Sequence, residues 1–199
     1  MFSPSRFSYP FLLTQTIACL SFGSFASVSH AATPQPCGQD LLLQKLQGSW
    51  VAKGVRVSAI TGRDTQIEGR VKSACDAGDT YLVSENQVQE TTLSEGGAPL
   101  VRTYERVYWV SKLDFREPSL ETPSSYGLGS LKELTRPSIC GEWNGEVFRV
   151  IQNLPTQPPV RVISETQFPS STNSVYRERV YQGDRLLSRS EIAYTRTQP

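Results

Sequence analysis

Apolar and polar residues alternate along most of this chain with the two-residue period of β-strands. Turn sequences such as Ser84-Glu85-Asn86 and Gln182-Gly183-Asp184 separate several of the alternating segments. Because the connections between consecutive segments are short, they favour antiparallel hairpins. The pattern predicts an all-β protein with strands at 49–60, 66–72, 80–84, 87–93, 100–112, 146–152, 160–167, 175–182 and 185–195.

Two segments depart from this period. Residues 39–47 place Leu41, Leu42 and Leu46 on one helical face before Gly48, which predicts a short N-terminal helix. Residues 113–138 are rich in proline, serine and glycine, and they predict a long loop. A loop of this length in a compact domain is typically a lid, a binding loop or a flap.

The final strand shows what faces the interior. Ser188 and Ser190 share a face with Leu186, Ile192 and Tyr194, so the inner face carries small hydroxyl groups at its middle. Such residues favour a closed barrel with room for a small ligand. Alternatively, the two serines bond to neighbouring backbone in an ordinary core. A cavity of about 300 Å³ or more would favour ligand binding, and a filled interior would favour a protein-interaction role.

Residues 1–31 have the pattern of a secretory signal peptide. Arg6 supplies a basic start, an apolar stretch follows, and Ser29-His30-Ala31 is a small-x-small cleavage signal. This predicts a mature single domain of residues 32–199 that is secreted or periplasmic and has no transmembrane segment. An uncleaved membrane anchor is one alternative, and a lipid-modified Cys19 is another.

Removal of this leader takes away His30, the only histidine of the chain. Its loss excludes histidine-based triads, general bases and metal ligands. No other catalytic constellation is visible, so we expect a non-enzymatic protein without a cofactor or metal. Loss of Arg6 also leaves equal numbers of basic and acidic side chains, which argues against nucleic acid as a partner.

Cys37, Cys75 and Cys140 remain in the mature chain. Their spacings match no zinc-ligand pattern, and an oxidising compartment favours one disulfide among them. We predict that Cys75 pairs with Cys140, because both lie beside expected strand ends. A Cys37–Cys140 bond is the alternative, since sequence does not determine connectivity.

The helix followed by Leu46-Gln47-Gly48-Ser49-Trp50 resembles the start of a lipocalin, and Tyr194-Thr195-Arg196 resembles the terminal arginine of lipocalins and fatty-acid-binding proteins, the calycin superfamily. The resemblance implies an antiparallel up-and-down barrel of about eight to nine strands. It also implies that Trp50 closes one end of the barrel with Arg196 packed over its ring, a cation–π contact. The Thr-Asp-Tyr signature of lipocalins is missing, and no helix follows the last expected strand.

One face of the 100–112 strand carries alternating arginine and tyrosine. It can be a ligand face that binds a carboxylate or a polar aromatic group. It can also be a solvated outer face stabilised by cross-strand stacking, which the similar pattern of Arg177, Arg179 and Tyr181 favours. The residues of the possible ligand face are Tyr104, Arg106, Tyr108, Ser188, Ser190 and Tyr194.

These features together predict an exported calycin-type barrel that binds a small apolar or amphipathic molecule. The principal alternative is a secreted interaction module, an inhibitor or assembly factor, with a filled barrel that contacts another exported protein through residues 113–138. An isomerase or lyase that acts on a bound pigment or lipid is a third alternative.

Overall fold

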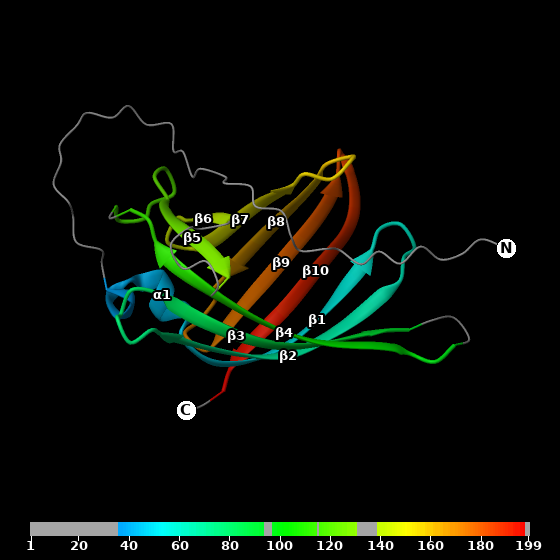
Figure 1. Ribbon diagram of the computed structural model, residues 1–199, viewed down its shortest axis with the longest axis horizontal. Coiled ribbons are helices and arrows are strands. Elements are labelled where there is room, and N and C mark those ends of the chain that lie inside the picture. The colour runs from blue at the N-terminus through cyan, green and yellow to red at the C-terminus, as the bar shows by residue number, and fades with distance from the viewer. Residues whose placement is uncertain (1–35, 94–96, 115, 131–138, 198–199) are drawn as a thin grey trace.

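The computed structural model describes residues 36–93, 97–114, 116–130 and 139–197, so the expected leader with Cys19 and His30 lies outside the described residues. Within the described part, the strands form one closed barrel in which chain neighbours pair antiparallel and β1 pairs with β10 (Figure 1). The predicted all-β, up-and-down barrel is therefore confirmed, although the described residues form ten strands and not the expected eight to nine. The strands are β1 (Gly48–Ser58), β2 (Asp64–Cys75), β3 (Leu82–Thr92), β4 (Leu100–Lys112), β5 (Ser124–Ser130), β6 (Ile139–Trp143), β7 (Val147–Leu154), β8 (Val160–Gln167), β9 (Asn173–Gln182) and β10 (Arg185–Arg196).

The strand boundaries differ from the expectation in two places. The expected turn at 84–86 is wrong, because these residues pair with both β2 and β4 inside the single strand β3. The expected long loop at 113–138 contains β5, and the following β6 was not predicted. Residues 115 and 131–138 of that loop lie outside the described residues. Glycines at 127 and 129 hid β5, since glycine is rare in strand interiors.

The predicted N-terminal helix is confirmed as a 3₁₀ turn, η1 (Cys37–Gln39), followed by α1 (Leu41–Leu46). Asp40 caps α1 by accepting a 2.9 Å hydrogen bond from the backbone N–H of Leu43. In the described residues, no helix is long and apolar enough to cross a bilayer.

The hydrophobic core lies where α1 covers one end of the barrel, which we call the closed end. Leu42 and Leu43 of α1 pack there against buried side chains from five strands. The strand residues of this cluster are Leu82, Val110, Tyr126, Trp143 and Phe148. Large buried side chains fill the closed end, so it has the packing of an ordinary core.

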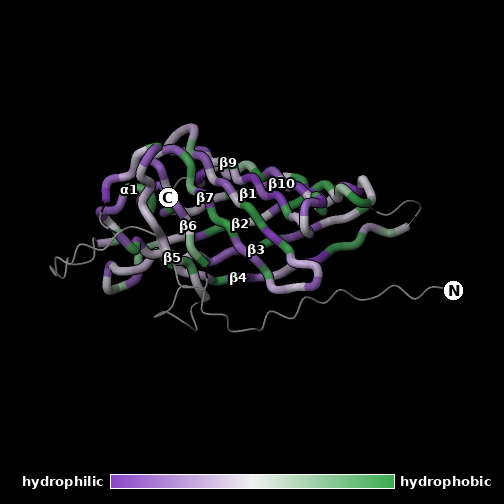
Figure 2. Tube along the Cα trace, turned by 90° about the horizontal axis from the view of Figure 1, so that it is seen from above, coloured by the Kyte–Doolittle hydropathy of each residue, from purple (hydrophilic) through white to green (hydrophobic). Residues whose placement is uncertain are grey.

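The opposite end is built differently, and we call it the open half. β5 pairs with β4 only at Tyr108–Lys112, so in the described part of the chain no strand lies beside residues 100–107 of β4 on that side. The walls formed by β1–β4 and β7–β10 spread apart away from α1 in Figure 1. Hydrophobic and hydrophilic residues alternate along these strands in Figure 2, as expected for strands with an inner and an outer face.

The predicted Cys75–Cys140 disulfide and its Cys37–Cys140 alternative are both wrong. Cys75 is bonded to Cys37, with 5.9 Å between their Cα atoms. The η1 turn is held against the β2–β3 turn, where the N–H of Cys37 donates to the carbonyl of Asp79 at 2.7 Å. Cys140 lies on β6, and β3, β4 and β5 separate that strand from β2 in the barrel. Cys37, Cys75 and Asp79 lie close enough together to hold a metal ion. Because the two sulfurs are joined in the disulfide, neither is a thiolate that could bind a metal ion there.

Removal of the Cys37–Cys75 bond, as in a Cys37→Ala/Cys75→Ala double variant, should lower the free energy of unfolding by about 2–5 kcal/mol. The reason is that the bond restricts a loop of the unfolded chain, with 38 residues of sequence separation. Urea unfolding of the wild type and the variant, both without reductant, checks this. Peptide mapping without reductant that found Cys75 joined to Cys140 would contradict the assignment.

Candidate functional site

The barrel seam between the first and last strands is closed by Trp50 and Arg196, which are register partners on β1 and β10. Cζ of Arg196 lies 4.5 Å from the centre of the Trp50 ring. Arg196 Nη2 donates to the carbonyl oxygens of Lys45 at 3.1 Å and Gln47 at 2.9 Å, and Trp50 Nε1 donates to that of Leu46 at 3.2 Å. The structure thus brings the two residues together at the closed end, where the resemblance places them.

A second group of predicted residues lies in the open half, except Tyr108, which packs against the closed-end core. Strand pairing places the whole possible ligand face on the barrel interior, from β4 and β10. Arg56 Nε of β1 donates at 3.2 Å to Ser190 Oγ of its register partner on β10, so the two side chains lie on the same face of the sheet as Trp50 and Ile192. The interpretation of the β4 arginine–tyrosine face as an outer face is therefore wrong. Arg177, Arg179 and Tyr181 do lie on the outer face, where Arg177 pairs with Glu191.

One detail of the final strand also differs from the expectation. The register of β10 shifts between Leu186 and Ser188, so Leu186 pairs with Tyr181 and leaves the face shared by the two serines. Such a shift is a β-bulge, which adds one residue to one strand. The inner face of β10 is therefore more polar than the alternation predicts.

The interior of the open half contains a network of charged and hydroxyl groups, of which Tyr104 belongs to the predicted ligand face, whereas Arg56, Glu90, Tyr176 and Glu178 were not singled out. Arg56 Nη1 lies 2.9 Å from Glu90 Oε1, and Tyr104 donates its hydroxyl hydrogen to the same oxygen at 2.8 Å. On the facing wall, the Tyr176 hydroxyl lies 2.7 Å from Glu178 Oε2 and 3.0 Å from Ser164 Oγ. The inward position of Arg56 was predictable from the sequence, because Arg56 lies an even number of residues after Trp50 on β1 and so shares its face.

Burial and neighbouring charges shift the pKa values of several side chains in this part of the interior. Burial alone would lower the pKa of Arg56, but Glu90 and Glu178 outweigh it and raise the pKa of the guanidinium. Burial, aided by Glu178, raises the pKa of Tyr176 well above its ordinary value. Burial also raises the pKa of Tyr194. The tyrosines therefore stay neutral near pH 7 and act as hydrogen-bond donors and aromatic surfaces.

An apolar cluster adjoins this network. Ala52, Ile67 and Ile192 are buried together, and Val88, Tyr176 and Tyr194 pack against them. The interior of the open half therefore offers apolar surface and hydrogen-bonding groups side by side. Ligand pockets in proteins typically combine these two kinds of surface.

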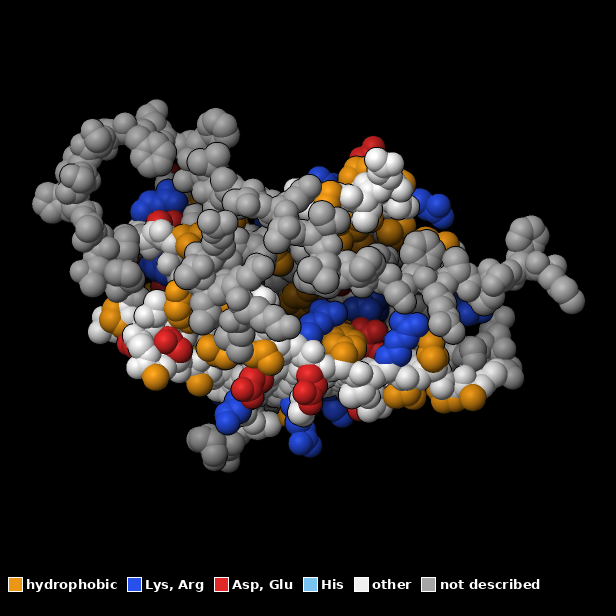
Figure 3. All heavy atoms as spheres, viewed as in Figure 1, with side chains coloured by type: hydrophobic (Ala, Val, Ile, Leu, Met, Phe, Trp, Pro, Cys, Tyr) orange, Lys and Arg blue, Asp and Glu red, His pale blue; other side chains and the backbone are white. Residues whose placement is uncertain are grey.

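Water reaches this part of the interior. Most of its inner side chains are half-buried, whereas those of the closed-end core are buried. The side chains of Arg56 and Glu90, for example, are 35% and 14% exposed. Figure 3 shows basic, acidic and hydrophobic side chains meeting in a hollow near the middle of this face. The open half is therefore not a filled core.

A buried ionic cluster supports the closed end. Asp40 and Lys112 are 1% and 6% exposed at the side chain, with 3.3 Å between Oδ2 and Nζ. The Tyr126 hydroxyl lies 2.9 Å from Asp40 Oδ2, and burial together with Asp40 raises the pKa of this hydroxyl. The cluster lines a small pocket of about 140 Å³ that also touches Trp143 and Glu117.

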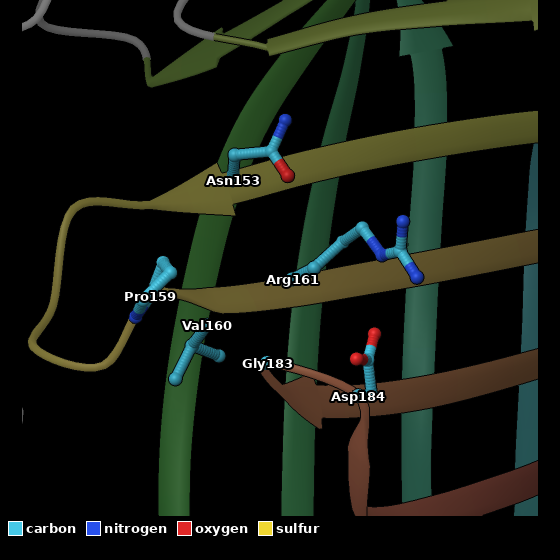
Figure 4. Close-up of a pocket in the computed structure, with 6 residues that line it drawn as sticks. All are labelled: Asn153, Pro159, Val160, Arg161, Gly183 and Asp184. Carbon is cyan, nitrogen blue, oxygen red and sulfur yellow. The ribbon is translucent and has the colours of Figure 1, made fainter.

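A further pocket of about 230 Å³ lies at the ends of the β7–β8 and β9–β10 hairpins. Figure 4 shows the residues that line it: Asn153, Pro159, Val160, Arg161, Gly183 and Asp184. Asn153 and Arg161 are cross-strand partners on the outer face, so this pocket is a surface feature at the rim. Neither pocket reaches the size of about 300 Å³ expected for a closed ligand cavity. These two pockets therefore do not meet the size criterion set for a ligand-binding cavity, and the candidate site rests on the solvent-accessible interior of the open half.

No protein-family model matches the chain, and no curated protein matches its sequence. Among solved structures, the S-type phycobiliprotein lyase CPES from Guillardia theta aligns over 82% of this chain and 96% of its own, with a TM-score of 0.52 and 10% identity. A protein of unknown function from Nostoc punctiforme, of the DUF3598 family, aligns over 84% of this chain and 53% of its own (TM-score 0.47, 13% identity). Rv2717c from M. tuberculosis aligns over 83% of this chain and all of its own (TM-score 0.43, 16% identity).

The strand pairing shows a closed, antiparallel up-and-down β-barrel, and the lyase has a similar fold. At 10% identity this likeness concerns the fold, because one fold supports many functions.

Proposed function

We propose that this chain is an exported, non-enzymatic protein that binds a small, partly apolar molecule in the open half of its barrel. The observation that carries the proposal is the half-buried interior in which the Arg56–Glu90–Tyr104 network adjoins the cluster of Ile67 and Ile192. An amphipathic ligand would replace water on the apolar cluster while its polar atoms meet hydroxyl and guanidinium groups.

Export is supported by the signal-peptide pattern of residues 1–31 and by the Cys37–Cys75 bond, since disulfides persist mainly in oxidising compartments. The absence of catalytic activity is inferred from the loss of the only histidine with the leader. Native mass spectrometry of the protein purified from an exporting host tests two parts of the proposal together. We expect an intact mass beginning at Ala32, and a bound small molecule that is released on denaturation.

A titration with the neutral dye Nile red tests the position of the site. We expect saturable binding that Ser188→Trp weakens by about tenfold, because Ser188 faces the interior. Arg189→Trp is the matched control, since the neighbouring side chain on β10 faces outward and is exposed. Equal effects of the two substitutions, or no saturable binding by the wild type, would contradict ligand binding in the open half.

The second candidate is an interaction module for another exported protein. The observation that favours it is the β4 segment 100–107, where the outward side chains of Val101 and Val107 are 50% and 40% exposed. Among the described residues no strand pairs with this segment on its β5 side, and such an edge can pair with a strand of another protein. Co-purification of a protein instead of a small molecule in the mass spectrum would support this alternative.

A further inference from the structure

The outer face of the barrel carries two neighbouring rows of side chains that cross strands β7, β8, β9 and β10. Each row consists of cross-strand partners, so its side chains lie side by side on one surface. The first, which we call the paired row, consists of Arg149, Glu165, Arg177 and Glu191. The second, which we call the arginine row, consists of Ile151, Ile163, Arg179 and Arg189. Both rows face outward, because they alternate along the strands with inward residues such as Ser164 and Glu178.

The charges of the paired row compensate one another. Arg149 Nη2 lies 2.6 Å from Glu165 Oε1, and Arg177 Nε lies 2.8 Å from Glu191 Oε2. Arginine and glutamate alternate along the row, and opposite charges on neighbouring strands stabilise a sheet that faces water. This row therefore needs no partner.

The arginine row lacks this compensation. Arg179 and Arg189 are direct cross-strand partners, although like charges opposite one another destabilise a sheet. Arg179 lies 3.3 Å from Glu165 Oε2 and so shares this carboxylate with Arg149. Arg189 is exposed, and in the part of the chain that the structure describes it makes no ion pair within 4.0 Å. The row thus carries uncompensated positive charge.

Apolar and aromatic side chains adjoin these cations. Ile151, at one end of the arginine row, is 47% exposed. Beside the row, Arg161 and Tyr181 are cross-strand partners, with Arg161 Cζ 5.5 Å from the centre of the Tyr181 ring. Arg161 makes no ion pair within 4.0 Å among the described residues, although Asp184 lines the same rim pocket (Figure 4). Arginine and tyrosine are enriched in protein–protein interfaces, where they contribute much of the binding energy.

We propose that this outer surface docks an acidic region of another protein. The surface consists of Ile151, Arg161, Ile163, Arg179, Tyr181 and Arg189. Carboxylates of the partner would lie against Arg179 and Arg189 and relieve their repulsion, while apolar side chains of the partner cover the two isoleucines. The surface lies outside the barrel and away from the β4 segment, so the inference does not depend on ligand binding.

The paired row argues against other anionic partners. Nucleic acids and anionic lipid surfaces present phosphate groups over a wide area. They would meet the carboxylate of Glu191, whose side chain is 67% exposed and lies two residues from Arg189 along β10. A protein can instead place a few carboxylates opposite the arginine row and leave Glu191 uncontacted.

The substitution Arg189→Glu separates docking from stability. It places a carboxylate opposite Arg179 and so repeats the alternation of arginine and glutamate in the paired row. We expect the midpoint of thermal unfolding to stay the same or to rise, although an acidic partner would lose its contact. A fall in the midpoint would show that Arg189 stabilises the free barrel, and it would overturn the inference.

Short random peptides displayed on phage and selected on the mature protein supply a probe for the surface. We expect the selected peptides to combine acidic and apolar residues. A synthetic copy should bind the Arg189→Glu variant about tenfold more weakly than the wild type. Ile151→Ser should also weaken binding, because the exposed isoleucine belongs to the surface. Arg70→Glu is the matched control and should bind as the wild type does, since Arg70 is an exposed arginine on the outer face of β2.

Several results would overturn the docking surface. They are selected peptides without acidic residues, equal weakening by Arg70→Glu and Arg189→Glu, and the absence of any peptide that binds saturably. Vesicles of phosphatidylglycerol and duplex DNA test the other classes of partner. Binding of either probe by the wild type that is lost in Arg189→Glu would also overturn the inference, because the surface would then recognise phosphate groups.

Discussion

Replacement of Trp50 by alanine should lower the free energy of unfolding by about 3–5 kcal/mol, as is typical for truncation of a buried aromatic side chain. Trp50 is 5% exposed and packs under Arg196 at the seam where β1 pairs with β10. Its loss would leave a cavity there and remove the surface on which the guanidinium lies. Urea unfolding monitored by circular dichroism measures the change.

A double-mutant cycle of Trp50→Ala and Arg196→Ala tests the contact between these two side chains. The single Arg196 variant should cost about 2–4 kcal/mol, because it loses two charged hydrogen bonds to the carbonyls of Lys45 and Gln47 in addition to the ring contact. The two changes should be non-additive by about 1–2 kcal/mol. Arg185→Ala, at the other end of β10, should add to Trp50→Ala without coupling. Additive effects of Trp50 and Arg196 would show that the contact does not stabilise the seam.

Asp40→Ala should destabilise the protein by about 3–5 kcal/mol, because it leaves Lys112 buried without this counter-charge. It also removes the cap of α1 and the acceptor of the Tyr126 hydroxyl. Tyr126→Phe is the graded control: it removes a single hydrogen bond and should cost about 1–2 kcal/mol. Denaturant unfolding of both variants gives the comparison. If Asp40→Ala costs no more than Tyr126→Phe, the buried ion pair does not stabilise the closed end.

Trp50→Ala and Asp40→Ala need not affect ligand binding, because the closed end and the open half are separate parts of the barrel. Trp50 and Asp40 act at the closed end, whereas Arg56, Tyr104 and Ser188, which belong to the proposed ligand site, line the open half. A barrel that is tightly packed at one end and solvent-accessible at the other can hold a ligand without giving up its core.

The sequence by itself determined the class of fold and the barrel seam. The alternation of apolar and polar residues identified most strands, because burial of one face imposes a period of two. The short helix, Trp50 and Arg196 were predictable because they lie in local patterns at the two ends of the expected barrel. The inward direction of Ser188 and Ser190 followed from the alternation along β10, although the bulge beside Leu186 did not.

Only the tertiary structure decided which face of β4 is inside. Both faces of that strand mix polar with apolar or aromatic groups, so the alternation did not distinguish them, and the register with β3 placed Arg102 and Arg106 on the interior. The same holds for Arg56 and Glu90, which are bonded across 34 residues of sequence, and for Asp40 and Tyr126, bonded across 86. The Cys37–Cys75 bond depended on the docking of η1 against the β2–β3 turn. These contacts join distant segments, and their geometry is set by how the strands pair around the whole barrel, which no local pattern encodes.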